Sequence, residues 1–387
     1  MKNWLDKVIN NSKNVNKIDP KLYDKYDIKR GLRNSDGTGV TVGFTKIGSV
    51  IGYTFENDKK VCIDGKLFYR QKEIHELADL SGHLGFEKVI YLLLFGEIPT
   101  DYELSKFMEL LDHYRNLPDN FTENMILKIP SRDIMNKIQR SILVLYSHDE
   151  DPDNLSIEKN IIQSIKLIAR IPTIMAYGYQ AKSHYFDNKS LHIHAPQNDI
   201  GTAKNILHMI RQDNKFTKLE AETLDLLLIL HAEHGGGNNS AFATHVVSSS
   251  GTDIYSAIST AVGSLKGPKH GGANIKVRNM IKNIKENVDY SNTKELKNYL
   301  LKILKGEVFN KKGLIYGMGH AVYTKSDPRA VLLKKKAKKL AISKDKLDDF
   351  KLYENIEKLT KEIFKDLKGN DCEICANIDL YSGFVYE

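Results

Sequence analysis

Three short fragments combine histidines, a carboxylate and an arginine with small residues, which suits chemistry on a small, multiply charged anion. They are HAEHGGGNNSAFATH (231–245) with GPKHGGAN (267–274), GMGHAVYTKSDPRA (317–330) and NIDLYSGFVYE (377–387). Histidines and carboxylates can transfer protons or hydrogen-bond a reacting group. Glycines let a substrate approach the backbone. The fragments therefore predict an enzyme site that handles protons and carboxylates.

In the first fragment, His231 and His234 stand three residues apart at the end of a predicted buried helix, before three glycines. His234 is predicted to reach an anion or carbonyl in a cleft. A core histidine satisfied by hydrogen bonds is a serious alternative for His231 and His245. The order H-A-E-H lacks the H-E-x-x-H spacing of a zinc helix, so no metal site is predicted.

His270 falls between two predicted helices, flanked by Gly267–Pro268 and Gly271–Gly272. The positive end of the helix dipole disfavours protonation of a histidine near a helix N-terminus. A neutral imidazole is the donor that an enol or oxyanion requires. The alternative is an ordinary loop histidine.

His320 and Arg329 share the second fragment. The fragment is not a dinucleotide-binding motif, because Val322 stands where the third glycine belongs. Arg329, after Asp327 and Pro328, suits bidentate recognition of a carboxylate. Equally, Asp327 could simply neutralise Arg329, and the sequence leaves both interpretations open.

Asp379 lies between two apolar residues and before an expected turn at 381–383. A carboxylate in partly apolar surroundings has a raised pKa and is a better general base. Cys372 and Cys375 form C-x-x-C without a second pair, so two incidental buried thiols are predicted. The lysine run 334–339 indicates a solvated helix face or, alternatively, a contact to a phosphate-bearing cofactor.

Composition indicates a globular protein without a membrane span. The 387 residues are 41% hydrophobic and 27% charged, and no apolar run approaches the roughly 18 residues of a span. Three cysteines do not make a disulfide framework, which favours the cytoplasm. The net charge of +8 is spread along the chain and comes with no recognisable nucleic-acid motif, so nucleic acid is not a predicted partner.

The elements that must position these residues are mainly helical. A polar, partly helical lead-in over 1–35 precedes a small β-hairpin near 40–70, with strand signals at 41–55 and 61–70 and a turn at Asn57–Asp58. Periodicity predicts the following helices: 85–99, 131–148, 157–180 with a kink or restart at Pro172, 221–234 and 252–267. From 275 to 370 the chain is richer in lysine and predicts a second, smaller helical domain.

The fragments, in this order, resemble citrate synthase. The likeness extends to DGTGV…VGFTKIG, GKLFYR, GFEKVIYLLLFGEIPT, PSRDIMNKIQRSILVLYSHDEDPD and LIARIPTIMAYGYQAK, and so to nearly the whole chain. The resemblance implies a mainly α, multi-helical homodimer whose large and small helical domains close over the site. It implies a large domain over 1–272, a small domain over 273–376 and the start of a return to the large domain at 377–387.

The resemblance also implies the reaction and the roles. Acetyl-CoA, a co-substrate rather than a tightly bound cofactor, condenses with oxaloacetate, and the thioester is hydrolysed to citrate and CoA. Asp379 removes a methyl proton, His270 stabilises the enol, and His320 polarises the oxaloacetate carbonyl. His234 and Arg329 hold oxaloacetate oxygens. The CoA adenine lies near the 314–320 loop, and the expected CoA-binding residues are Leu314, Gly317, Gly319 and Lys325.

Two features depart from the family pattern. Gln71 stands where the family usually has glycine, and family members continue for several helices beyond the NIDLYSG segment, with further arginines. The expectation is therefore an incomplete carboxylate site and a weakened dimer. Two alternatives follow, a 2-methylcitrate synthase that uses propionyl-CoA and a truncated, non-catalytic homologue that binds a partner. One extra methylene changes binding by only about 1–3 kcal/mol, so the sequence does not separate the two acyl-CoA substrates.

Overall fold

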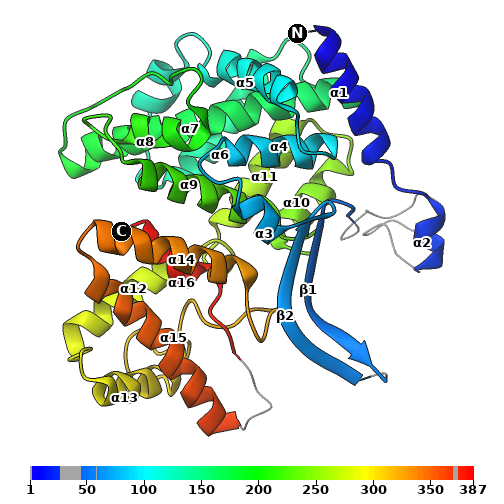
Figure 1. Cartoon of the computed structure of the whole chain (residues 1–387). Helices are drawn as coiled ribbons and strands as arrows, with labels where there is room; N and C mark the ends of the chain where they lie inside the picture. Colours follow the sequence, from blue (N-terminus) through cyan, green and yellow to red (C-terminus); the bar gives the residue numbers. More distant parts are fainter. Residues whose placement is uncertain (1, 27–44, 58, 369–373) are drawn as a thin grey trace. The chain divides into compact units, whose positions relative to one another are not determined.

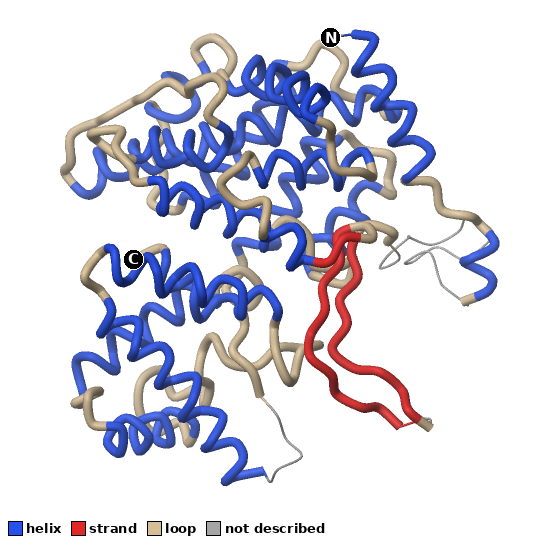
Figure 2. The backbone as a smooth tube through the Cα atoms, viewed as in Figure 1, coloured by secondary structure: helices blue, strands red, loops and turns tan. Residues whose placement is uncertain are grey.

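The computed structural model describes residues 2–26, 45–57, 59–368 and 374–387. Helices make up most of the described chain, and nearly all of the described β-strand residues lie in one hairpin (Figures 1 and 2). The predicted mainly α fold with a small N-terminal hairpin is confirmed. Residues 41–44 of the predicted strand region, Asp58 and Cys372 lie outside the described residues.

By the density of their contacts, the residues fall into two compact units. Unit 1 comprises Met1–Gly48 and Leu80–His270, and unit 2 comprises Ser49–Asp79 and Gly271–Glu387. The hairpin thus groups with the C-terminal part of the chain, whereas the sequence assigned it to the large domain. The predicted domain limits at 272 and 376 stay predictions.

Unit 1 is a stack of helices. Its elements are α1 (Lys2–Val15), α2 (Lys21–Lys25), α4 (Gly85–Phe95), α5 (Asp101–Arg115), the π-helix η1 (Thr122–Leu127), α6 (Ile134–Leu145), the 3-10 helix η2 (Tyr146–His148), α7 (Ile157–Asp187), α8 (Gly201–Ile210), α9 (Lys218–His231), α10 (Asn239–Ser248) and α11 (Ile254–Lys266).

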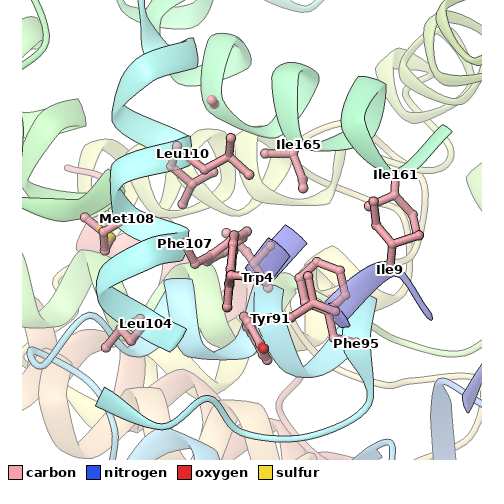
Figure 3. Packing of buried hydrophobic residues seen from close by; sticks show 14 residues of the cluster. Trp4, Ile9, Tyr91, Phe95, Leu104, Phe107, Met108, Leu110, Ile161 and Ile165 are labelled. Carbon is pink, nitrogen blue, oxygen red and sulfur yellow. The ribbon is translucent and has the colours of Figure 1, made fainter. Parts of the chain in front are cut away.

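One apolar core of unit 1 joins α1, α4, α5 and α7 (Figure 3). Trp4 and Ile9 of α1 are buried in it beside Tyr91 and Phe107, whose rings meet edge to face at 5.6 Å. The predicted lead-in is therefore partly helical, as expected, but its first helix is not simply polar. A buried aromatic contributes roughly 1.5–3 kcal/mol through the apolar surface it removes from water, which fastens this helix to the core.

Side-chain caps explain where several unit 1 helices begin. Thr217 forms a capping box with Glu220 at the start of α9, and Asp133 and Asp253 accept backbone N–H groups at the starts of α6 and α11. The predicted restart at Pro172 is wrong, because α7 runs as one helix through this buried proline, and the predicted kink stays a prediction. A proline in a helix interior costs about 3 kcal/mol or more, and burial of α7 residues on both sides of Pro172 offsets this cost.

Unit 2 combines the hairpin with a helical cluster. Its elements are β1 (Gly48–Glu56, whose first residue belongs to unit 1), β2 (Lys59–Tyr69), β3 (Lys72–Glu73), α3 (Ile74–Ala78), α12 (Ala273–Asn287), α13 (Thr293–Leu304), α14 (Pro328–Ser343), α15 (Leu347–Lys368) and α16 (Ile378–Val385).

The sheet of unit 2 has the strand order β1-β2-β3. Tyr69 of β2 pairs with Lys72 of β3 across a tight antiparallel turn. In this turn Arg70 has a left-handed φ of 57°, whereas Gln71 is not among the residues with positive φ. A side chain is therefore compatible with the backbone at Gln71, although the family usually has glycine there.

Helix α16 is anchored by both apolar and ionic contacts. Phe384 packs its ring against Phe350 and Tyr353 of α15, at 5.4 and 5.3 Å between centroids. Tyr381 donates its hydroxyl hydrogen bond to Glu357 of α15.

The expected turn at 381–383 is wrong, since these residues lie inside α16. The reason is packing: Gly383 faces α12 so closely that a Cβ there would lie 3.1 Å from a methyl carbon of Val277.

Candidate active site

The loop of residues 317–327, here called the His320 loop, is fastened to the start of α16. Gly317 and Gly319 have φ of 84° and 86°, a left-handed conformation that glycine adopts without strain. The N–H of Gly319 donates to the carbonyl of Cys375 at 2.7 Å, and the N–H of Asn377 donates to the carbonyl of Gly317 at 2.9 Å. Met318 and Ala376 form an antiparallel bridge. A short two-stranded junction therefore holds the loop.

The imidazole of His320 is held by this loop in one protonation pattern. Its Nδ1 accepts the backbone N–H groups of Val322 and Tyr323 at 3.0 and 3.2 Å. Because a backbone N–H only donates, the proton of the neutral ring lies on Nε2. Burial lowers the pKa of His320 most strongly, Asp327 opposes this effect, and Arg329 lowers the pKa further. The geometry thus supplies a neutral ring whose Nε2–H can donate.

Tyr323 supports the ring of His320 from one side. The two rings stack with centroids 4.7 Å apart and planes 25° apart, and Tyr323 is almost fully buried. On the same tyrosine, the Arg329 guanidinium lies 5.9 Å from the ring centroid. Aromatic and cation–π contacts of this kind are each worth roughly 0.5–1.5 kcal/mol. His320 and Arg329 are therefore both positioned by contacts with the buried ring of Tyr323.

Arg329 forms a bidentate ion pair within its own segment. Its Nε and Nη2 donate to the two carboxylate oxygens of Asp327 at 3.0 and 2.8 Å. Asp327 also accepts the N–H of Arg329 and so caps α14, with both side chains buried. Of the two interpretations of this pair, neutralisation by Asp327 is what the structure contains. The pair uses two of the five guanidinium N–H groups, so three donors are left to serve a second carboxylate.

Asp379 occupies the first turn of α16. Asn377 is the N-cap, and its side-chain oxygen accepts the N–H of Asp379 at 3.0 Å. The amide nitrogen of the same asparagine donates to the carbonyl of Gly319 at 2.8 Å. One side chain therefore bonds both to the residue before His320 and to the turn that carries Asp379. His320, Arg329 and Asp379 are brought into a single framework within unit 2.

In unit 1, His270 meets a hydroxyl. Its Nε2 lies 2.8 Å from Oγ of Ser240, in the first turn of α10. Ser240 Oγ also lies 3.1 Å from the carbonyl of Ala261, to which it can donate. The single hydroxyl proton serves either the carbonyl or Nε2. In the first case the His270 proton lies on Nε2, and in the second case it lies on Nδ1.

The His234 stretch is joined to the same helix. His234 is half-buried beyond the end of α9, and Gly235 follows it with a φ of 79°. The carbonyl of Gly235 accepts the side-chain amide of Asn238, the N-cap of α10, at 2.8 Å. His231, by contrast, is exposed and its Nδ1 bonds to the carbonyl of Leu227 at 2.8 Å. The start of α10 therefore contacts His270 directly and bonds to the residue that follows His234.

The expected CoA-binding residues lie on or beside the His320 loop. Leu314 is 55% exposed, Gly317 and Gly319 form the junction with α16, and Lys325 is exposed. In the lysine run, Lys334 and Lys338 pair with Glu354 of α15, at 3.7 and 3.8 Å. This part of the run is therefore a helix face neutralised by the neighbouring helix.

Cys375, the described member of the C-x-x-C, is a free and buried thiol, as expected. Its Sγ lies 3.5 Å from the carbonyl of Tyr323. Among the residues that the structure describes, no group of three or more histidine, cysteine or carboxylate side chains is placed to hold a metal ion. In the same part of the chain, no helix is long and apolar enough to cross a membrane.

Sequence reasoning missed three residues that shape the site: Ser240, Asn377 as a cap, and Tyr323. For Asn377 a signal was present, because asparagine two residues before an acidic residue is a common helix start. For Ser240 and Tyr323 the sequence carries no such signal, since their partners are set by tertiary packing.

Comparison with known proteins gives one family. The family profile described as citrate synthase, C-terminal domain, matches residues 36–387. The citrate synthase of Haloferax volcanii is 29% identical over 367 residues, covering 93% of this chain and 84% of that protein. The 2-methylcitrate synthase of Mycobacterium tuberculosis is 32% identical over 327 residues, covering 84% of this chain and 73% of that protein.

Solved structures agree. The citrate synthase of Pyrobaculum aerophilum has a TM-score of 0.73 at 29% identity and covers 90% of this chain and 80% of its own. The citrate synthase of Thermoplasma acidophilum, solved as a ternary complex with carboxymethyl coenzyme A and oxaloacetate, has a TM-score of 0.71 at 25% identity, covering 90% and 82%. The predicted family and enzyme class are confirmed: the chain belongs to the citrate synthase family of acyltransferases.

Proposed function

We propose that this protein is a citrate synthase, which condenses acetyl-CoA with oxaloacetate and hydrolyses the thioester to citrate and CoA. The observation that carries the proposal is the single framework holding His320 and Asp379. Asn377 and the Gly317–Gly319 junction join the loop that carries the neutral imidazole donor to the backbone turn that carries the Asp379 carboxylate. Carbon–carbon bond formation through an enol needs both a base and a carbonyl donor.

In the first step, the Asp379 carboxylate removes a methyl proton from acetyl-CoA. Electrons of the broken C–H bond move to the thioester carbonyl, whose oxygen becomes an enol or enolate oxygen. His270 stabilises that oxygen by donating from Nδ1. This role requires the Ser240 hydroxyl to donate to Nε2, which the 2.8 Å separation of Oγ and Nε2 permits. A base without the donor would not offset the cost of the carbanion.

In the second step, the enol carbon attacks the ketone carbon of oxaloacetate. The ketone oxygen gains the electron pair, and His320 Nε2–H polarises it and can supply its proton. The neutral state of His320 suits this donation. The lone pair on Nδ1 already accepts two backbone N–H groups, so the proton lies on Nε2, where it can be donated to the ketone oxygen. Water then hydrolyses the thioester, which releases citrate and CoA.

Oxaloacetate is held by His234 and Arg329 in this proposal. Asp327 fixes the Nε edge of the Arg329 guanidinium, so the remaining N–H groups are presented in a set direction. Leu314, Gly317, Gly319 and Lys325 contact CoA, with exposed Leu314 near the adenine and Lys325 near anionic groups. Acetyl-CoA is a co-substrate, and no tightly bound cofactor takes part. We propose further that the protein is a cytoplasmic homodimer.

A 2-methylcitrate synthase is the second candidate. Relatives with that name, from Mycobacterium tuberculosis and Shewanella oneidensis, are 32% and 30% identical to this chain, which is the same level as the citrate synthases. The two activities differ by one methylene in the acyl group.

Release of CoA from the 387-residue chain tests both candidates. With oxaloacetate present, faster release from acetyl-CoA than from propionyl-CoA supports citrate synthase, and the reverse order supports the second candidate. No release with either thioester contradicts both, and calorimetry with oxaloacetate would then show whether the chain is a non-catalytic homologue that only binds.

A further inference from the structure

The β1–β2 hairpin lies against the His320 loop at two glycines. A Cβ on Gly52 would lie 2.9 Å from the carbonyl carbon of Val322, and a Cβ on Gly65 would lie 2.6 Å from Cδ1 of Tyr323. Both hypothetical atoms would come even closer to backbone oxygens, of Val322 and Ser326. Real Cβ atoms essentially never approach within 3.0 Å. Neither glycine has a positive φ, so close approach rather than backbone conformation requires them.

Hydrogen bonds reinforce this contact. The N–H of Gly65 donates to the carbonyl of Ser326 at 3.1 Å and lies 3.2 Å from its hydroxyl oxygen. That hydroxyl donates to the carboxylate of Asp64 at 2.8 Å, and the Tyr323 hydroxyl reaches the carbonyl of Lys66 at 3.5 Å. Residues 64–66 of β2 therefore hydrogen-bond to both Tyr323 and Ser326.

The loop residues that the hairpin contacts are also those that set the protonation pattern of the His320 ring. Val322 and Tyr323 supply the two N–H groups to Nδ1, and Tyr323 supplies the ring under the imidazole. We infer that the hairpin is the positioning element for His320, with Gly52 and Gly65 as positioning residues that keep its Nε2–H tautomer fixed. The catalytic meaning of this inference rests on the proposed function, whereas the structural meaning does not.

A methyl group at either glycine forces the strand and the loop apart. Displacements near 1 Å at a reacting group cost on the order of 100-fold in rate. We therefore expect Gly65→Ala to lower kcat by about that factor. Gly52→Ala, which meets one backbone segment rather than a backbone and a ring, should have a smaller effect in the same direction.

Three variants and two readouts test this inference. The readouts are kcat with KM from CoA release, and the tautomer of His320 from ¹⁵N NMR of histidine-labelled protein. Gly251→Ala is the control, because its φ of 77° strains the variant whereas nothing lies within 4 Å of the new Cβ. It should lose stability and keep both kcat and the tautomer.

The expected result is a lower kcat and a mixture of His320 tautomers in Gly65→Ala and Gly52→Ala. If Gly65→Ala does not fold, Ser326→Ala, which removes the hydroxyl that bonds to Asp64 and to the N–H of Gly65 without adding a Cβ to the hairpin, should shift the tautomer in the same sense. Folded glycine variants with wild-type kcat and a single Nε2–H tautomer would overturn the inference. If wild-type protein releases no CoA, the proposed function fails, but the tautomer measurement still decides the role of the hairpin.

Discussion

The two histidines that we propose to donate to carbonyl oxygens have different hydrogen-bond partners. Backbone N–H groups face Nδ1 of His320, and a backbone N–H cannot become an acceptor. A serine hydroxyl faces Nε2 of His270, and a hydroxyl can either donate or accept. The direction of donation is therefore fixed at His320 and adjustable at His270.

This difference matches the proposed chemistry. The oxygen served by His320 only gains negative charge before it is protonated, so one fixed donor suffices. The oxygen served by His270 becomes an enol oxygen and then returns to a carbonyl. Since the proposed oxygen contact is made by Nδ1–H, the direction in which the Ser240 hydroxyl donates decides whether His270 can serve that oxygen.

The largest effect is expected from Asp379→Ala. Asp379 belongs with His320, whose direction of donation is fixed, because Asn377 joins the two segments. Removal of the base should lower kcat by roughly 10²–10⁴-fold, the range of general-base catalysis. Oxaloacetate affinity, measured by calorimetry, should remain close to wild type, because Asp379 is not assigned to hold that substrate. Intact turnover with lost oxaloacetate binding would refute the role.

A second effect concerns the stability of the helix that carries Asp379. Burial raises the pKa of Glu357, but hydrogen bonds from Lys361, Tyr381 and Lys334 outweigh it and lower the pKa to about 2. The carboxylate therefore stabilises the fold above its unfolded pKa near 4.5, and this contribution is lost as the pH falls toward 2. Glu357→Gln should cost roughly 2–3 kcal/mol at pH 7.

Urea unfolding at pH 7 and pH 3 measures this cost. The difference between wild type and Glu357→Gln should shrink at the lower pH. A matched control is Glu362→Gln, which removes a half-exposed carboxylate 3.6 Å from Lys297. That change should cost no more than about 1 kcal/mol. Equal losses in the two variants would contradict the anchoring of α16 by Glu357.

Ser240→Ala tests the adjustable hydrogen bond of His270. Loss of one neutral hydrogen bond is worth about 0.5–1.5 kcal/mol, so kcat should fall up to about tenfold. Ser240→Thr keeps a hydroxyl and should recover part of the rate. A threonine variant as slow as the alanine variant would show that the hydroxyl does not orient His270.

The smallest effect is expected where one side chain joins the His320 loop to α16. Asn377→Ala removes the cap of Asp379, which costs about 1 kcal/mol of stability. Asn377→Asp keeps an acceptor for that cap but cannot donate to the carbonyl of Gly319. The aspartate variant should therefore keep most of the stability and still lose rate. Wild-type kcat in Asn377→Asp would show that the bond to Gly319 does not matter.

Local signals made much of the fold predictable. Asp133 begins α6 because the cap and the N–H that it accepts are three residues apart. Helices 85–99 and 252–267 were placed by apolar periodicity, and the structure gives Gly85–Phe95 and Ile254–Lys266. Errors arose where tertiary packing outweighed a local signal, as at Pro172 inside α7.

The candidate site shows the same division. His320, Asp379 and the glycines were named from their fragments, because motif residues lie close together in the sequence. The partner of His270 is 30 residues away, and the contact between Gly65 and Ser326 spans 261 residues. Such pairs are set by packing of distant elements, which one sequence does not reveal. The framework of the site therefore had to come from the structure.

The state of His320 is tested most directly by ¹⁵N NMR of histidine-labelled protein over pH, assigned with His320→Gln and His270→Gln variants. We predict a single Nε2–H tautomer for His320, with a pKa below the usual 6.5, that is unchanged in Ser240→Ala. The same serine variant should change the tautomer of His270. A proton on Nδ1 of His320, or a mixed population in the wild type, would contradict this account.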